Sequence, residues 1–170
     1  MPLSTSPFLV LRCAAAAVAV SALLACTTTG PSTSPGRPGA AAPPAQPKAL
    51  FIRPAPGATL TRYDGKRNKG LDIAGNAGDP IVAAADGRVV FVGSQLRGYG
   101  NMVIVKHNET FLTAYAHNQA IAVKENQIVR QGQKIAEMGR SDSDRVKLHF
   151  EIRKDGTAVD PEPYLNGKLR

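Results

Sequence analysis

Residues 146–153 alternate strictly between apolar and polar side chains, and no other pattern constrains the fold of this chain as strongly. Successive side chains of a β-strand point to opposite faces, whereas a helix repeats about every 3.6 residues. The segment therefore predicts a strand with one buried face. The apolar face is formed by Val146, Leu148, Phe150 and Ile152, and the polar face by Lys147, His149, Glu151 and Arg153.

Other short strands are predicted throughout the second part of the chain. Residues 101–107 and 111–117 are apolar runs around His-Asn-Glu-Thr, which is typical of a hairpin, and residues 81–92 contain a tight-turn signal, Asp86-Gly87, between two apolar runs. The only helical element expected is a single turn over residues 161–165. These patterns predict an all-β fold, an antiparallel β-sandwich or partly open barrel.

The beginning of the chain has the layout of a secretory signal. Residues 13–25 are apolar or small and follow one positive charge, and they are fewer than the roughly 20 residues that a membrane-spanning helix needs. The run ends in Leu-Leu-Ala-Cys, which resembles a bacterial lipobox, where the Cys thiol carries the lipid. We therefore expect residues 1–25 to be a lipoprotein signal peptide and Cys26 to be lipidated. The alternative is an ordinary signal peptide with a chance Cys.

Residues 26–48 are expected to be a tether between the lipidated Cys26 and the folded domain. They contain Pro, Ser, Thr, Gly and Ala with almost no large apolar side chain. Such a segment buries too little surface to offset the entropy of ordering it. The sorting rule of enteric bacteria keeps a lipoprotein in the inner membrane when Asp follows the lipidated Cys. Residue 27 is Thr, which by resemblance to that rule favours the periplasmic face of the outer membrane.

The folded part, residues 49–170, carries the acidic residues of the chain and most of its basic ones. It holds 18 basic and 13 acidic residues, a net charge of +5. Export places this charge away from nucleic acid, so anionic cell-wall polymers or an acidic protein surface are the expected partners. The Gly-rich phrases lie among strands without a following helix, so we expect no nucleotide or other organic cofactor.

Three ordered phrases carry the chemical information of the domain. They are Asn68-Lys69-Gly70-Leu71-Asp72, Tyr115-Ala116-His117 and Lys147-Leu148-His149-Phe150-Glu151. Together they resemble the LytM, or lysostaphin-type, zinc endopeptidases of bacterial cell walls over about residues 51–166. The resemblance implies the antiparallel half-barrel sandwich of that family, the duplicated hybrid motif fold. It also implies a site in which active members hold zinc with His-x3-Asp and the second His of His-x-His, while two further His activate the attacking water.

This sequence departs from the active family members at two positions. Asn68 stands at the first zinc ligand and Lys147 at one catalytic His, whereas Asp72 and His149 match ligands and His117 matches the other catalytic His. Catalytic zinc normally keeps three protein ligands and one open position. A Lys that shares a strand face with His149 repels the ion and, being protonated near pH 7, is no general base. The sequence therefore predicts a degenerate site with no catalytic residue and no metal, and an active zinc endopeptidase with an altered site is the alternative.

The same degenerate pattern resembles the NlpD branch of the family, which comprises lipoprotein activators of murein hydrolases. The resemblance implies a non-catalytic protein that binds periplasmic N-acetylmuramoyl-L-alanine amidases and relieves their autoinhibition at the division septum. The implied binding surface is the former substrate groove, lined by Asn68, Asp72, His117, Lys147 and His149. That branch usually carries a LysM peptidoglycan-binding module, whereas residue 49 here follows the tether, so a passive peptidoglycan-binding or anchoring module is another alternative.

The sequence also predicts the contacts of several side chains in and near the groove. We expect Lys147 to pair with Asp72 and so supply the positive charge of the missing zinc, with Asn68 and His149 hydrogen-bonding across the pocket; the alternative is a Lys147 that reaches solvent. The remaining residues are expected to be structural: His107 packs at a strand end, Glu151 has a structural partner, Asn126 adopts a left-handed turn conformation, and Tyr99 either lines the groove or caps a loop.

Overall fold

The computed structural model describes residues 50–169, which form eleven strands and one short helix. The predicted signal peptide, the tether and Cys26 lie outside the described residues. Within the described part, no helix is long and apolar enough to cross a membrane. The elements are β1 (Thr59–Thr61), β2 (Leu71–Ala74), β3 (Pro80–Val82), β4 (Gly87–Gly93), β5 (Met102–Lys106), β6 (Phe111–Ala116), β7 (Asn118–Ile121), β8 (Ile128–Val129), β9 (Lys134–Met138), β10 (Lys147–Lys154), β11 (Thr157–Val159) and α1 (Glu162–Leu165).

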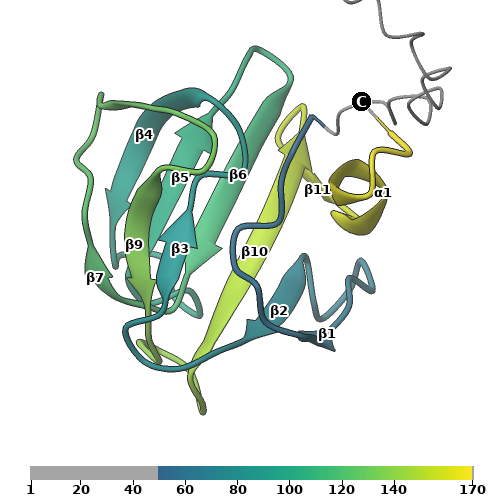
Figure 1. The fold of residues 1–170 in the computed structure, drawn as a ribbon. Helices are drawn as coiled ribbons and strands as arrows, with labels where there is room; N and C mark the ends of the chain where they lie inside the picture. The colour runs from purple at the N-terminus through teal and green to yellow at the C-terminus, as the bar shows by residue number, and fades with distance from the viewer. Residues whose placement is uncertain (1–49, 170) are drawn as a thin grey trace, which may run out of the picture. The chain divides into compact units, whose positions relative to one another are not determined.

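Two antiparallel sheets face each other (Figure 1). The larger sheet has the strand order β1-β2-β10-β6-β5-β4-β8, with β11 paired to β10. The smaller sheet has the order β3-β9-β7 and lies over one face of the larger one. The predicted all-β, antiparallel sandwich is therefore confirmed, and the helical turn expected near residue 161 is present as α1.

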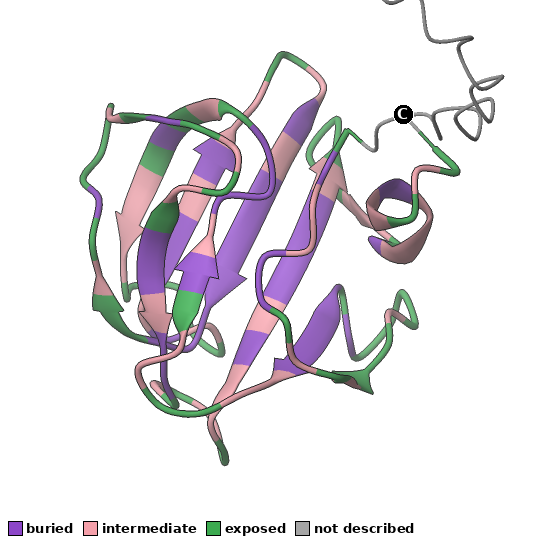
Figure 2. Ribbon diagram, in the orientation of Figure 1, coloured by how far each residue is buried: buried purple, intermediate pink, exposed green. Residues whose placement is uncertain are grey.

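The core fills the space between the two sheets. The larger sheet contributes Leu148, Phe150 and Ile152, which are fully buried, and the smaller sheet contributes Ile81 and Ile135. Figure 2 shows how the buried positions follow the strands of both layers. The apolar face predicted for residues 146–152 is thus the core face of β10. Burial of a large aliphatic or aromatic side chain contributes about 1.5–3 kcal/mol to folding, so this single strand anchors much of the core.

The hairpin predicted around His-Asn-Glu-Thr is formed by β5 and β6, which pair with Val105 opposite Thr113. Asn126, in the turn before β8, has a φ of 67° and so confirms the left-handed conformation expected there.

The two apolar runs around Asp86-Gly87 do not pair with each other. The first run, β3, pairs with β9 in the smaller sheet, and the second, β4, pairs with β5 and β8 in the larger sheet. The segment between them contains the buried Ala83 and Ala84. The Ala83 backbone N–H donates to the Gln133 carbonyl, and the Ala84 carbonyl accepts from the Ile52 N–H. This segment therefore carries the chain from one layer of the sandwich to the other.

Strand β10 lies between β2 and β6, and this position builds the site. Its register places His149 opposite Asp72 on β2 and opposite Ala116 on β6. His117 follows β6 directly. Side chains from three regions that are distant in sequence therefore meet on the outer face of the larger sheet.

Candidate functional site

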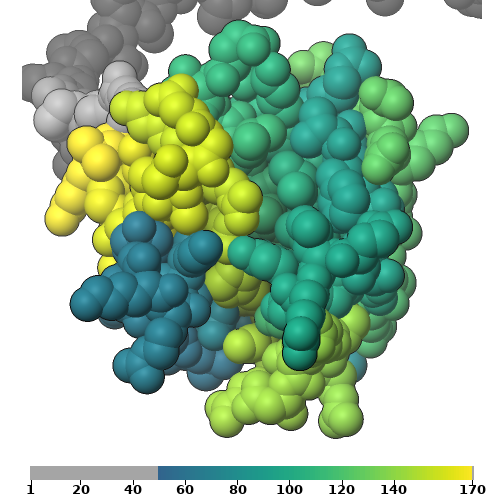
Figure 3. Space-filling view, turned by 180° about the vertical axis from the view of Figure 1, so that it is seen from behind, coloured from purple at the N-terminus to yellow at the C-terminus, as the bar shows by residue number. Residues whose placement is uncertain are grey.

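The polar face of β10 and Asp72 of β2 form the floor of a hollow of about 530 Å³. Lys147, His149, Glu151 and Arg153 are two residues apart on one strand, so their side chains share a face. All five residues predicted for the groove line this hollow. Lys147 and His149 bond Asp72, the His117 ring lies tilted beside that of His149, and Asn68 has other partners. Figure 3 shows this face, where the blue segment around β1 and β2, the yellow-green loop before β10 and the teal β4–β5 region come together.

Asp72 is held by two cations. Lys147 Nζ lies 2.9 Å from Asp72 Oδ2, and His149 Nδ1 lies 2.7 Å from Asp72 Oδ1. Burial by itself would raise the pKa of this carboxyl, but the hydrogen bonds and charges of His149 and Lys147 outweigh burial and lower the pKa to about 2. The structure thus brings Lys147 and Asp72 together as expected, and the Lys147 side chain is only 19% exposed.

His149 bridges two carboxylates. Besides the bond to Asp72, its Nε2 lies 3.1 Å from Glu151 Oε1. Burial opposes a charged imidazole, but the hydrogen bonds to Asp72 and Glu151 raise its pKa above the ordinary value of 6.5. Because both ring nitrogens face carboxylate oxygens, which only accept hydrogen bonds, this environment stabilises the imidazolium form of the ring.

Glu151 is fully buried and has three partners. Its carboxylate accepts from Arg153 Nε at 2.7 Å, from the Tyr99 hydroxyl at 2.9 Å and from His149. Burial would raise its pKa, but these hydrogen bonds together lower it. Glu151 therefore has the structural partner that we expected. The result is a chain of alternating charges that runs from Lys147 through Asp72, His149 and Glu151 to Arg153.

Tyr99 reaches this chain from the loop between β4 and β5. Its ring lies edge-on to His149, with centroids 5.8 Å apart, and it lines the hollow. The alternatives left open for Tyr99 are thus resolved in favour of the groove. The loop turns at Gly98 and Gly100, whose φ values of 86° and 58° favour glycine. The sequence phrase Gly-Tyr-Gly was the only local signal for this contact.

Asn68 does not form the hydrogen bond across the pocket that we expected. Its amide nitrogen donates to the Arg62 carbonyl at 3.1 Å, and its side-chain oxygen accepts from the Gly70 backbone N–H at 3.3 Å. The expectation for His149 was wrong in the same way, because Asp72 and Glu151 occupy both of its nitrogens. A neutral amide close to turning backbone is satisfied locally, which removes any need for a partner across the hollow.

His117 lies beside His149 and is held by the backbone. Its Nδ1 lies 2.9 Å from the Ser141 carbonyl, and its ring centroid is 6.1 Å from that of His149. Burial lowers its pKa, and the neighbouring charges of Lys147 and His149 lower it further. These effects outweigh the hydrogen bond to Ser141, which raises the pKa, and favour the neutral ring; because a carbonyl only accepts, the neutral ring bonds Ser141 by donating from Nδ1. Its φ of 64°, unusual for a residue with a Cβ, turns the ring toward the hollow.

The side chains of this hollow do not fit a catalytic zinc ion. Both oxygens of Asp72 and both nitrogens of His149 are taken by the charge chain, and an ammonium group lies against the carboxylate. Among residues 50–169, no group of three or more His, Cys, Asp or Glu is arranged to hold a metal ion.

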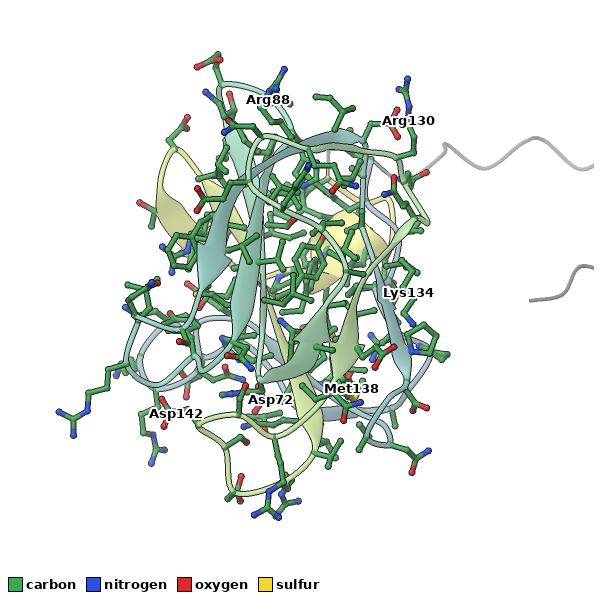
Figure 4. All side chains as sticks on the ribbon, turned by 90° about the vertical axis from the view of Figure 1, so that its left-hand side faces the viewer. Asp72, Arg88, Arg130, Lys134, Met138 and Asp142 are labelled. Atoms are coloured by element: carbon green, nitrogen blue, oxygen red, sulfur yellow. The ribbon has the colours of Figure 1, made fainter. Side chains whose placement is uncertain are left out.

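His107 lies away from this site. Its Nδ1 bonds the Asp86 carbonyl at 2.7 Å and its Nε2 bonds the Thr113 hydroxyl at 2.8 Å, which is the local packing that we expected. It borders a separate hollow together with Arg88 and Arg130. Figure 4 shows Arg88 and Arg130 at one end of the strands and Asp72 at the other.

The fold and the ordered phrases match a known protein family. A family model described as Peptidase family M23 matches residues 66–161. The chain belongs to peptidase family M23. The resemblance that the sequence phrases suggested is therefore confirmed.

Curated M23 relatives carry lipoprotein and activator names. The chain is 56% identical over 114 residues to "Lipoprotein NlpD/LppB homolog" of Pseudomonas aeruginosa, covering 66% of this chain and 38% of the relative. It is 56% identical over 98 residues to "Murein hydrolase activator NlpD" of Escherichia coli, covering 58% and 26%, and 57% identical over 98 residues to "Outer membrane antigenic lipoprotein B" of Haemophilus influenzae, covering 58% and 24%. The chain thus spans about a quarter to two fifths of the length of these relatives.

Solved M23 structures share the fold at lower identity. A zinc-containing peptidase from Vibrio cholerae superposes with a TM-score of 0.62 at 29% identity, covering 66% of this chain and 39% of that chain. The catalytic domain of lysostaphin from Staphylococcus simulans superposes with a TM-score of 0.57 at 28% identity, covering 68% and 89%. The lysostaphin-type fold predicted from the sequence is therefore confirmed.

Proposed function

We propose that this M23 domain cuts nothing itself and activates periplasmic N-acetylmuramoyl-L-alanine amidases that split septal peptidoglycan. The observation that carries the proposal is the Lys147–Asp72 ion pair of 2.9 Å, which lies where the phrases of active members place the metal site. The activator name of the Escherichia coli relative supports the same conclusion.

The absence of catalysis follows from the residues of the site. In this proposal Asn68 stands in place of a zinc-binding His and Lys147 in place of a catalytic His. The charge chain supplies internally the positive charge that zinc would bring to Asp72. Asp72 and His149, which match two zinc ligands, are thus bonded to each other and to Lys147 and Glu151, so only a rearrangement of these bonds would free them to hold a metal ion.

Activation is then a change of populations in the amidase. A protein that binds the open form of an autoinhibited enzyme better than the closed form shifts the equilibrium by its difference in affinity. The proposed binding surface is the groove formed by Asn68, Asp72, His117, Lys147 and His149. A rigid, fully bonded charge chain suits this role because little conformational entropy remains to be lost on binding.

The proposed location is the periplasmic face of the outer membrane, at or near the division septum. Cys26 is the proposed lipid anchor, and lipoprotein names among the relatives support it. A chain carrying several acyl groups stays on a membrane, because each buried methylene contributes about 0.8 kcal/mol.

Dye release from labelled peptidoglycan tests the proposal. Residues 27–170 are added alone and then with each periplasmic amidase of the same cell, in parallel with the Lys147→Ala variant. We expect no release by the domain alone, strong stimulation of at least one amidase, and weaker stimulation by the variant. Release by the domain alone that a chelator abolishes would establish an active peptidase instead. Sedimentation with cell-wall sacculi and no effect on any amidase would establish a passive wall-binding module.

A further inference from the structure

The hollow over the charge chain continues in both directions as one groove. A second hollow of about 280 Å³ shares Asp72 and Lys147 with it, and a third of about 250 Å³ shares Lys69. The second extends the groove past Arg145 before β10, and the third extends it along Arg153 toward the β10–β11 turn. The three hollows therefore adjoin one another along this face of the domain.

The main acidic groups of this groove are committed to partners inside the domain. Asp64 Oδ1 accepts three backbone N–H groups, from residues 66, 67 and 68. Asp72 is bonded to Lys147 and His149, and the buried Glu151 to three neighbours. Asp72 and Glu151 are therefore balanced by cations of the domain, whereas Asp64, in the central hollow, and Asp144, in the second one, are exposed carboxylates.

The cations of the groove are differently placed. Arg67 and Lys69 are exposed, line the central hollow, and form no ion pair within residues 50–169. Lys147 Nζ has three protons, and one of them serves Asp72. Arg145 is paired with Asp144 only at 3.5 Å on the open surface, where such pairs contribute little. N–H donors without an ion-pair partner, from Arg67 and Lys69 in the loop before β2, and remaining N–H donors of Lys147 on β10 therefore line one hollow.

We propose that this groove recognises a carboxylate-bearing peptide segment of the amidase, and that an acidic side chain binds against Arg67, Lys69 and Lys147. The inference rests on the proposed function, because it names the chemistry by which the partner is held. It commits to an acidic segment because Arg67 and Lys69 form no ion pair within residues 50–169, so a neutral or basic segment that covered them would leave their charges unpaired. The exposed Leu60, which lines the second hollow, would contact an apolar side chain of the segment.

The experiment measures affinity between the full-length chain in detergent and a purified amidase that it stimulates. Variants Arg67→Glu and Lys69→Glu are compared with Lys69→Arg and with Arg88→Glu, an exposed residue at the opposite end of the strands (Figure 4). We expect at least a tenfold loss of affinity for each of the first two variants and less than a twofold change for the two controls. The wild-type affinity should also fall as NaCl is raised from 50 to 400 mM.

Stimulation that persists with Lys69→Glu, at an affinity that salt does not change, would overturn the carboxylate inference and leave the activator proposal standing. If Lys69→Glu loses sedimentation with sacculi but keeps its affinity for the amidase, the anionic ligand is the cell wall, which also overturns it. If no amidase binds or responds, the activator proposal fails and this inference fails with it. Unfolding midpoints of Arg67→Glu and Lys69→Glu should lie close to that of the wild type, because neither exposed side chain forms a hydrogen bond or an ion pair within residues 50–169, and Arg67 has only an electrostatic attraction to the exposed Asp64.

Discussion

Replacing Lys147 with Met removes the ammonium group from Asp72 while keeping an unbranched apolar stem. Both side chains are largely shielded from solvent, with 10% of the Asp72 and 19% of the Lys147 side chain exposed. A pKa of about 2 for Asp72, against the ordinary 3.8, corresponds to roughly 2–3 kcal/mol of stability at pH 7. Because His149 supplies the other hydrogen bond, we expect the loss of Lys147 alone to cost about 1–1.5 kcal/mol.

Urea unfolding of residues 27–170 measures this cost without adding salt. The Lys147→Met variant should lower the midpoint and leave the denaturant slope unchanged. A double-mutant cycle with Asp72→Asn should give a coupling energy of about 1 kcal/mol. The matched control is Lys134→Met, whose partner Glu137 lies at 2.7 Å but on the surface, and this variant should change stability by less than about 0.5 kcal/mol.

The pH dependence gives an independent check of the same pair. Because the folded state lowers the pKa of Asp72, its contribution is fully present above pH 3.8 and disappears as the pH falls toward 2. The wild type should therefore lose stability more steeply than Asp72→Asn between pH 4 and pH 2. A coupling energy near zero between Lys147 and Asp72, or identical acid unfolding of the wild type and Asp72→Asn, would refute the reasoning that Lys147 supplies the positive charge beside Asp72.

Three further predictions concern the same site and the anchor. The folded state raises the pKa of His149, so the stability that this residue contributes is present below pH 6.5 and is lost as the pH rises through the pKa of the folded state. The free energies of unfolding of wild type and His149→Gln should therefore converge on the alkaline side. A difference between them that does not change with pH would contradict this. The Asn68→His, Lys147→His double variant should bind about one zinc per chain by calorimetry while the wild type binds none, and a variant that binds none would show that the ligand geometry is also lost. Cys26→Ser should move the protein from the membrane to the soluble periplasmic fraction, and persistent membrane association would argue against Cys26 as the anchor.

The site could be predicted from the sequence wherever its residues are neighbours on one strand. The period-two pattern of residues 146–153 places Lys147, His149, Glu151 and Arg153 on one face, and β10 has that face. The Lys147–Asp72 pair was predicted from two sequence phrases whose paired residues are 75 positions apart, and the structure places Lys147 Nζ 2.9 Å from Asp72 Oδ2. The hydrogen bonds of Asn68 were not predictable, because a short amide takes the backbone groups of its own loop, whose path depends on what the loop packs against.

The sequence by itself determined that residues 50–169 form short strands with little helix and which face of β10 is buried. These properties follow from side-chain period and chemical type, which are local. Only the tertiary structure decided that β3 and β4 belong to different layers, that Tyr99 donates a hydrogen bond to Glu151, and that His149 lies between two carboxylates. Those outcomes depend on strand register and burial, which are set when distant segments close one core and place charges at hydrogen-bonding distance away from water.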